Sequence, residues 1–119
     1  MATIYVLKLE EGKYYIGKSD NIESRIKEHK EGKGSLWTKK YKVIDLKKVI
    51  VCNDPFDEDK VVKKYMMKYG IENVRGGSYN HMKLCKIEMK ILRREIFTAM
   101  NRCYKCGKNT HYANKCLVI

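Results

Sequence analysis

Four metal-binding side chains near the C-terminus constrain the fold of this chain more than any other feature. Cys103, Cys106, His111 and Cys116 follow the spacing C-x2-C-x4-H-x4-C. Two intervening residues let the first two sulfurs reach one ion through a tight turn, and three thiolates with one imidazole make the closed tetrahedral set of a structural zinc site. A segment this short cannot bury a core, so the metal must supply its folding free energy. The sequence therefore predicts a Zn²⁺ site within residues 102–119.

The same segment resembles the retroviral-type CCHC zinc knuckle, a nucleic-acid-binding module. That family presents aromatic or aliphatic side chains to unstacked bases, and Tyr104 and Tyr112 stand at those places. The resemblance implies phosphate contacts for three lysines, Lys105, Lys108 and Lys115. Thr110 stands where the family usually has glycine, which leaves the zinc ligands intact. A knuckle that binds a protein partner instead of single-stranded nucleic acid is the alternative.

The basic charge of the chain indicates a polyanionic partner. The net charge is +12 over 119 residues, and residues 81–119 carry nine Lys and Arg against two Glu, so +7 of the excess lies there. Such a surface attracts nucleic acid, with membranes and acidic proteins as alternatives. No apolar run approaches the roughly 20 residues that span a bilayer, and no signal peptide is evident after Met1. We expect a soluble intracellular protein, in the cytoplasm or nucleus, with no membrane partner.

An α/β domain with a small sheet is predicted over residues 1–80. Runs of apolar and β-branched residues at 4–9 and from 14 onward indicate two antiparallel strands joined by a turn, and a third strand is expected from 43 to 51. Residues 75–79, Arg-Gly-Gly-Ser-Tyr, are interpreted as a loop. The expected sheet is thus three-stranded and mostly antiparallel.

Helices are expected to flank this sheet. N-cap candidates at 19–21 precede a helix that continues to about residue 30. A second helix is expected to start at residues 53–55, with Pro55 in its first turn, and to run to about Tyr69, where Gly70 closes it. A basic amphipathic helix is predicted over residues 81–101, because apolar side chains recur at spacings of three and four at Cys85, Met89, Leu92, Ile96 and Met100. Cys85 is accordingly interpreted as buried.

Short motifs at the start of the chain resemble the GIY-YIG nuclease family. Ile4-Tyr5 is followed, after the hairpin, by Tyr15-Ile16-Gly17-Lys18, and Asn21, Arg25 and His29 continue at a spacing of four. Thr3 replaces the first glycine of the family's motif. The likeness covers roughly residues 2–80, and the stretch from Phe56 to Tyr79 is similar to a branch in large DNA viruses. Each motif is short, but their order and spacing together are fairly specific.

The resemblance implies a nuclease site in which five residues have separate roles. Tyr5 helps to activate the attacking water, and Tyr15 lies beside it on the adjacent strand. Arg25 grips phosphate, and His29, one helical turn further on, donates or shuttles a proton. Glu58 is the single carboxylate for a catalytic Mg²⁺ or Mn²⁺, although three other acids stand nearby, namely Asp54, Asp57 and Asp59.

The sequence therefore predicts a divalent-metal-dependent endonuclease that hydrolyses phosphodiester bonds in DNA, with nucleic-acid contacts from the knuckle and Lys18. The expected organisation is a nuclease domain at 1–80, a basic helix at 81–101 and a zinc knuckle at 102–119. The alternative is a non-catalytic nucleic-acid-binding protein that uses the knuckle on single strands; the presence of all five site residues favours the enzyme. DNA against RNA, target specificity and oligomeric state stay open, and a late polar contact is left open between Asn73 and Asn80.

Overall fold

The computed structural model describes residues 2–100. The predicted knuckle at 102–119 lies outside the described residues, and with it the side chains proposed for zinc, base and phosphate contacts: Cys103, Tyr104, Lys105, Cys106, Lys108, His111, Tyr112, Lys115 and Cys116. Two compact units are distinguished, residues 1–83 and 84–119, and each is described by itself. Within residues 2–100, no helix has the length and apolar character needed to cross a membrane.

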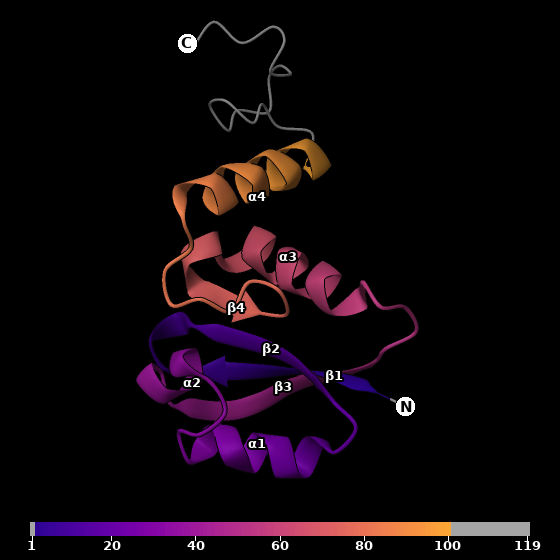
Figure 1. Ribbon diagram of the computed structural model, residues 1–119, viewed down its shortest axis with the longest axis vertical. Coiled ribbons are helices and arrows are strands. Elements are labelled where there is room, and N and C mark those ends of the chain that lie inside the picture. Colours follow the sequence, from indigo (N-terminus) through magenta and orange to yellow (C-terminus); the bar gives the residue numbers. More distant parts are fainter. Residues whose placement is uncertain (1, 101–119) are drawn as a thin grey trace, which may run out of the picture. The chain divides into compact units, whose positions relative to one another are not determined.

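The first unit is built on a four-stranded mixed sheet (Figure 1). Its strands are β1 (Thr3–Leu9), β2 (Tyr14–Ser19), β3 (Val43–Val51) and β4 (Val74–Gly76), in the spatial order β3-β1-β2-β4. The central strand β1 pairs antiparallel with both β2 and β3, whereas β4 pairs in parallel with β2. The α/β prediction is confirmed, but the expected number of strands is one too few.

The additional strand lies in the segment interpreted from sequence as a loop. Strand β4 is three residues long and pairs with Tyr14–Ile16 of β2. A run this short carries no period-two pattern, and its Gly-Gly sequence disfavours a strand assignment. The backbones approach so closely that a Cβ at Gly76 would lie 2.0 Å from the carbonyl oxygen of Ile16. The pairing of β4 with β2 therefore requires glycine at position 76, and a sequence pattern does not reveal that pairing.

Helices cover both faces of this sheet (Figure 1). Helices α1 (Ile22–Lys30) and α2 (Leu36–Lys40) lie on one face, and α3 (Asp57–Tyr69) lies on the other. Two 3-10 turns also belong to the unit, at Glu10–Gly12 and Ile71–Asn73. Helix α1 begins and ends as predicted, and Asn21 caps it by accepting a hydrogen bond from the backbone N–H of Ser24 at 3.2 Å.

The start of α3 differs from the expectation. The helix begins at Asp57, two residues after Pro55, because the preceding residues form a separate turn. In that turn the Asp54 carboxylate accepts the N–H of Phe56 at 2.8 Å, and the Asp57 carboxylate accepts the N–H groups of Asn53 and Asp54 at 2.9 and 3.0 Å. These bonds set the direction in which the helix leaves the turn, and Glu58 follows as its second residue.

Apolar side chains pack on both faces because strand residues alternate between them. On the face of α1 and α2, a buried cluster consists of Tyr5, Leu7, Leu9, Tyr15 and Trp37. The buried Arg75 closes this layer, with its guanidinium 4.6 Å from the centroid of the Trp37 ring. Its N–H groups donate to four backbone carbonyls, those of Ile71, Val74, His81 and Met82. Arg75 thus fixes the chain on both sides of β4.

The described part of the second unit contains α4 (Lys86–Ala99), which is shorter than the predicted helix at 81–101. Its N-cap is Cys85, whose thiol accepts the N–H of Glu88, while the Glu88 carboxylate accepts the N–H of Cys85. The interpretation of Cys85 as a buried side chain is therefore wrong, since it is exposed. Leu92 and Ile96 of the predicted apolar stripe are buried.

Candidate active site

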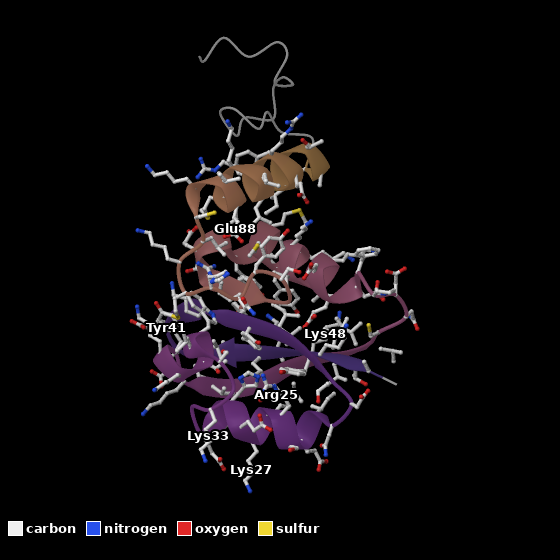
Figure 2. The ribbon with its side chains drawn as sticks, viewed as in Figure 1. Arg25, Lys27, Lys33, Tyr41, Lys48 and Glu88 are labelled. Carbon is white, nitrogen blue, oxygen red and sulfur yellow. The ribbon has the colours of Figure 1, made fainter. Side chains whose placement is uncertain are left out.

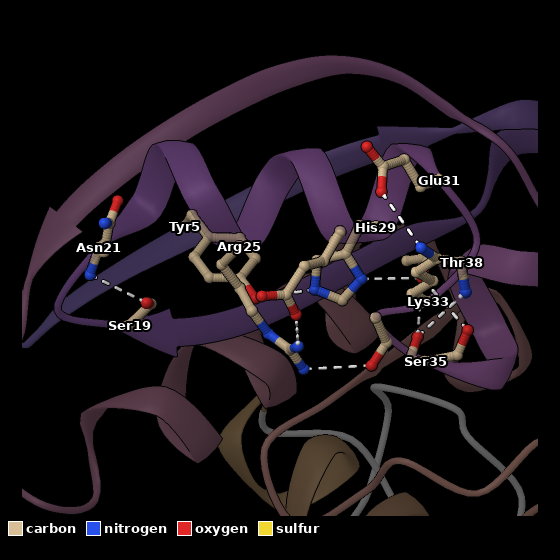
Figure 3. Close-up of polar contacts among 11 residues, drawn as sticks. Tyr5, Ser19, Asn21, Arg25, His29, Glu31, Lys33, Ser35 and Thr38 are labelled. Atoms are coloured by element: carbon tan, nitrogen blue, oxygen red, sulfur yellow. Dashed lines mark hydrogen bonds and ion pairs between the residues drawn. The ribbon is translucent and has the colours of Figure 1, made fainter.

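Tyr5, Tyr15 and His29 form the centre of the candidate site, and Figure 3 shows Tyr5 and His29. Tyr5 lies opposite Gly17 and Tyr15 opposite Leu7 in the β1–β2 ladder, which makes the two phenols diagonal neighbours with ring centroids 6.5 Å apart. His29 of α1 packs against both rings, with its centroid 5.8 Å from that of Tyr5 and 4.8 Å from that of Tyr15. The Tyr5 hydroxyl oxygen and His29 Nε2 are 2.9 Å apart, within hydrogen-bond distance. The structure therefore brings these three predicted residues together.

Burial controls the protonation states of Tyr5 and His29. The His29 side chain is 1% exposed, and burial, followed by the charge of Arg25, lowers the pKa of His29 to about 4. Burial likewise raises the pKa of the Tyr5 phenol, and Tyr15 adds to this shift. Near neutral pH both groups are therefore uncharged, and the hydrogen bond joins a neutral phenol to a neutral imidazole.

Arg25 lies one turn before His29 on the same helix face (Figure 3). Its guanidinium donates to the Glu28 carboxylate at 2.6 Å and to the Gly34 carbonyl at 3.1 Å. Burial disfavours its charge, but Glu28 and Tyr5 outweigh that effect, so the pKa of Arg25 is raised. Figure 2 shows Arg25 directed toward the sheet, whereas Lys27 projects away from it. A guanidinium has five N–H donors, so these two bonds leave donors for a phosphate.

Of the three acids in the first turn of α3, Glu58 is the one whose carboxylate has no hydrogen-bond partner among residues 2–100. The carboxylates of Asp57 and Asp59 are used by neighbouring backbone groups, as is that of Asp54. Burial raises the pKa of Glu58, while Lys18 opposes this shift. The charge of Glu58 in turn raises the pKa of Tyr15 and of Tyr5, so the carboxylate lies within electrostatic range of both phenols.

Asp59 positions the first turn of α3 beside β2. Its carboxylate accepts the N–H and the hydroxyl hydrogen of Ser78, each at 2.8 Å, in the turn that follows β4. Strand β4 itself ends opposite Ile16, one residue before Gly17. The sequence could not distinguish Glu58 from its acidic neighbours. The contacts do so, because the carboxylates of Asp57 and Asp59 are engaged in hydrogen bonds.

A divalent ion would find one free protein carboxylate at this site. No group of three or more His, Cys, Asp or Glu side chains that could hold a metal occurs among the described residues. Mg²⁺ commonly keeps several waters and binds through one or two carboxylates plus phosphate oxygens. A single half-buried carboxylate without a protein partner in residues 2–100 fits that requirement.

The sequence analysis missed two side chains near the site. Thr38 is buried, and its hydroxyl oxygen lies 2.8 Å from His29 Nδ1; it was missed because α2 was not predicted. Glu28 was missed because an i, i+3 acid beside Arg25 resembles an ordinary surface pair. Asn73, left open as a polar site contact, instead accepts a hydrogen bond from the Lys13 ammonium at 2.6 Å and donates to the Tyr69 carbonyl at 2.7 Å.

Acid should destabilise the fold through His29. Its folded pKa of about 4 lies below the ordinary 6.5, so the unfolded chain takes up the proton first as the pH falls. The neutral imidazole makes its full contribution to the free energy of unfolding above about pH 6.5. This contribution is lost as the pH falls toward 4, and the loss is at most about 3 kcal/mol. Urea unfolding at pH 7 and about pH 4.5 measures it.

The matched comparison for this prediction is His29→Gln. Glu58, whose raised pKa acts in the opposite direction, is present in both chains, and its contribution cancels in the difference. The variant should show the shallower dependence of unfolding free energy on pH. Equal slopes in the two proteins would contradict the role assigned to His29.

Comparisons with known proteins agree with this geometry at the level of the domain. Residues 1–59 match the model of the GIY-YIG catalytic domain, a nuclease family, and the match includes every residue from Tyr5 to Glu58 discussed above. The N-terminal half of the chain is therefore similar to a GIY-YIG catalytic domain. No solved structure matches the chain significantly.

The relatives are bacterial proteins whose names state no activity. A UPF0213 protein of Fusobacterium nucleatum is 29% identical over 97 residues, which is 79% of this chain and 96% of the relative. A UPF0213 protein of Bacillus cereus is 39% identical over 56 residues, covering 47% of this chain and 53% of the relative. One from Bacillus licheniformis is 46% identical over 35 residues, 29% of this chain and 36% of the relative. These matches support neither the expected viral branch nor the zinc knuckle.

Proposed function

We propose, from the match of residues 1–59 to the GIY-YIG catalytic domain, that this chain is a divalent-metal-dependent endonuclease that hydrolyses phosphodiester bonds in DNA. The observation that carries the proposal is the buried hydrogen-bonded pair of Tyr5 and His29, with Tyr15 and Arg25 beside it. A general base must lie within hydrogen-bond reach of the proton that it abstracts, and a neutral phenol can serve as one only when a second group accepts its own proton. A cation next to that base provides the site for a phosphate.

Each of these side chains has a separate role in the proposed hydrolysis of a phosphodiester. Tyr5 accepts a proton from water and gives its own hydroxyl proton to His29, 2.9 Å away. At the same time the water oxygen forms its bond to phosphorus, and the bond from phosphorus to the leaving oxygen breaks. The Arg25 guanidinium stabilises the negative charge that develops on the non-bridging oxygens. Tyr15 lies against His29 and limits the space around the reacting phenol. Solvent supplies the proton that the leaving oxygen takes up.

Glu58 is the residue that would hold a divalent ion such as Mg²⁺ or Mn²⁺. Its half-buried carboxylate lies within electrostatic range of both tyrosines, and no hydrogen bond engages it within residues 2–100. When bound, the ion supplies neutralisation of the phosphate and of the leaving oxygen. The exposed Lys18, which acts electrostatically on Glu58, adds a positive charge for the nucleic-acid backbone.

A nicking assay tests the proposed function. The full chain is incubated with supercoiled, linear, branched and single-stranded DNA, and with RNA, in the presence of Mg²⁺, Mn²⁺ or a chelator. Metal-dependent cleavage of DNA supports the proposal. Arg25→Gln should be nearly inactive, while Lys27→Gln, a basic residue two positions away that projects outward, should cut normally. Binding without cleavage of any substrate would favour the non-catalytic nucleic-acid-binding protein instead.

The proposal includes a zinc knuckle at residues 102–119, supported by the Cys and His spacing and by the +7 charge of residues 81–119. The purified chain is expected to contain one Zn²⁺ per molecule by elemental analysis. Cys103→Ser or His111→Ala should lower the zinc content without changing the melting transition of residues 1–83, because a structural metal is expected to supply the folding free energy of the segment that ligates it. Zinc-free chain with all four ligands intact and reduced would contradict this.

Nucleic-acid binding by the knuckle is a separate prediction. Tyr104→Ala and Tyr112→Ala should retain zinc but each lose roughly 1–3 kcal/mol of single-strand binding if bases stack on the rings. Fluorescence anisotropy with a labelled oligonucleotide measures the loss at fixed salt. Unchanged affinity in both variants would favour the alternative that the knuckle binds a protein partner instead of nucleic acid.

A further inference from the structure

The hydrogen bond between Tyr5 and His29 can be arranged in two ways, and these differ in what the pair can do. A neutral imidazole carries its hydrogen on either Nδ1 or Nε2. With the hydrogen on Nε2, His29 donates to the Tyr5 oxygen and cannot take the phenol proton. With the hydrogen on Nδ1, the Tyr5 hydroxyl donates to Nε2. The neighbours of the two ring nitrogens distinguish these arrangements (Figure 3).

Thr38 determines the Nδ1 side. Its hydroxyl oxygen lies 2.8 Å from His29 Nδ1, and the Ser35 carbonyl oxygen, which can act only as an acceptor, lies 3.3 Å from the same hydroxyl and can take its single hydrogen. The Ser35 hydroxyl, 3.0 Å from the same Thr38 oxygen, is able to donate to it. A hydroxyl whose hydrogen is already used toward a carbonyl acts as an acceptor in its other bonds. The hydrogen between His29 and Thr38 therefore resides on Nδ1.

The Tyr5 side leads to the same assignment independently. Tyr5 is 1% exposed, and among residues 2–100 the hydrogen-bonded atom that can act as an acceptor for its hydroxyl is His29 Nε2. Arg25, the other side chain with a hydrogen-bond effect on this phenol, is a donor only. If Nε2 carried the hydrogen, the Tyr5 hydroxyl would have no acceptor among the described residues, and a buried donor without a partner is costly.

We infer that Thr38 is a positioning residue that holds His29 as its Nδ1–H tautomer, so that Nε2 is the acceptor of the Tyr5 proton. The consequence for catalysis rests on the function proposed above. As Tyr5 takes a proton from the attacking water, its own proton passes to His29 Nε2, and the phenol remains neutral throughout. The resulting imidazolium donates from Nδ1 to Thr38 and from Nε2 to Tyr5. His29 is thus the acceptor in the first half of the reaction.

The fold holds Thr38 firmly in this place. Ser35 caps α2 by accepting the backbone N–H of Thr38 at 3.1 Å. Trp37, beside it in the same helix, is buried and donates from Nε1 to the Tyr14 carbonyl at 3.0 Å, which fixes α2 on β2. The close approach of His29 to Gly34, where a Cβ would lie 2.1 Å from Nδ1, leaves the imidazole little freedom to turn away.

Nitrogen NMR of the full chain, ¹⁵N-labelled at histidine, tests the tautomer without any need for activity. In the wild type near pH 7 we expect Nδ1 of His29 to be protonated and Nε2 to be unprotonated, a difference that the ring-proton couplings assign. His29→Gln identifies the signal, since it removes that resonance and leaves the other two histidines. A protonated Nε2 in the wild type would overturn the inference.

Substitution of Thr38 tests the positioning role. Thr38→Val keeps the shape but removes the acceptor, so we expect a mixture of His29 tautomers and a cleavage rate lowered roughly tenfold or more, with substrate KM unchanged. Thr38→Ser restores the hydroxyl and should restore both the spectrum and the rate. Thr98→Val, an exposed threonine in α4, should change neither. An unaltered spectrum and rate in Thr38→Val would overturn the role.

The dependence of the cleavage rate on pH in Thr38→Val adds a readout that a mere loss of packing would not change. The charged or titratable groups that face His29 are Tyr5, Tyr15, Arg25 and Glu28, and all of them remain in Thr38→Val. The acidic limb of the profile should therefore shift with the His29 resonance in the same variant. If Thr38→Val unfolds, the wild-type tautomer and Thr38→Ser still decide the inference. A chain with the Nδ1–H tautomer that cuts no substrate would refute the proposed function and leave the tautomer standing.

Discussion

Replacing Glu58 with glutamine is expected to lower the rate of Mg²⁺-dependent cleavage by at least about a hundredfold. The substitution keeps the size of the side chain but removes the charge that a hard divalent ion requires, and metal ions typically contribute several kcal/mol to the transition state. The fold should not lose stability, because burial already disfavours the charged form of Glu58, as its raised pKa indicates. Initial nicking rates over a Mg²⁺ titration, with melting temperatures alongside, measure both effects.

The neighbouring acids are the matched controls. Asp57→Asn and Asp59→Asn also remove one carboxylate each from the first turn of α3. Their native partners are backbone N–H groups, which the amide oxygen can still accept, and at Asp59 also the Ser78 hydroxyl, to which the amide N–H can donate. Both variants should therefore cut within about tenfold of the wild type, a margin far smaller than the transition-state contribution expected from the metal. Normal cleavage by Glu58→Gln together with an inactive Asp57→Asn or Asp59→Asn would show that another acid carries the metal.

The centre of the candidate site was predictable because local periodicity determines it. Strand alternation places Tyr5 and Tyr15 on the same face, and a spacing of four on a helix places Arg25 and His29 on one side. Both rules act within a hairpin and a single helix, and neither depends on the rest of the fold. The ring contacts of His29 with the two tyrosines also require α1 to pack on the sheet, which the family resemblance implied and periodicity did not.

The surroundings of that centre were not predictable, because they depend on contacts between distant segments. Thr38 reaches His29 from α2, a five-residue helix whose sequence, Leu-Trp-Thr-Lys-Lys, has no repeat long enough to indicate one. Strand β4 exists only through its pairing with β2. Glu58 likewise resembles its acidic neighbours in sequence, and what distinguishes it from Asp59 is a tertiary contact, the bonds that Asp59 makes to Ser78.

Gly17→Ala is expected to lower cleavage by about a hundredfold although it alters no reacting group. A Cβ at Gly17 would lie 2.2 Å from the Tyr5 hydroxyl oxygen and 2.3 Å from the ring carbon that bears it. The phenol must therefore move away from His29, and a displacement of about 1 Å at a reacting group can cost a factor of 10². Extra volume in a packed layer should also cost about 1–3 kcal/mol of unfolding free energy. Nicking rates and urea unfolding measure the two losses.

A double-mutant cycle separates this clash from any general effect of alanine in β2. Tyr5→Leu removes the hydroxyl and the ring carbon that the new Cβ would meet, so the stability cost of Gly17→Ala should be smaller in the Tyr5→Leu background than in the wild type. The interaction energy is expected to be roughly 0.5–3 kcal/mol, as for other residues in direct contact. Additive costs would mean that Gly17 acts through the strand backbone and not through Tyr5. Since Gly17 lies opposite Tyr5 in the ladder, a non-additive result would assign this glycine the role of keeping the phenol against His29.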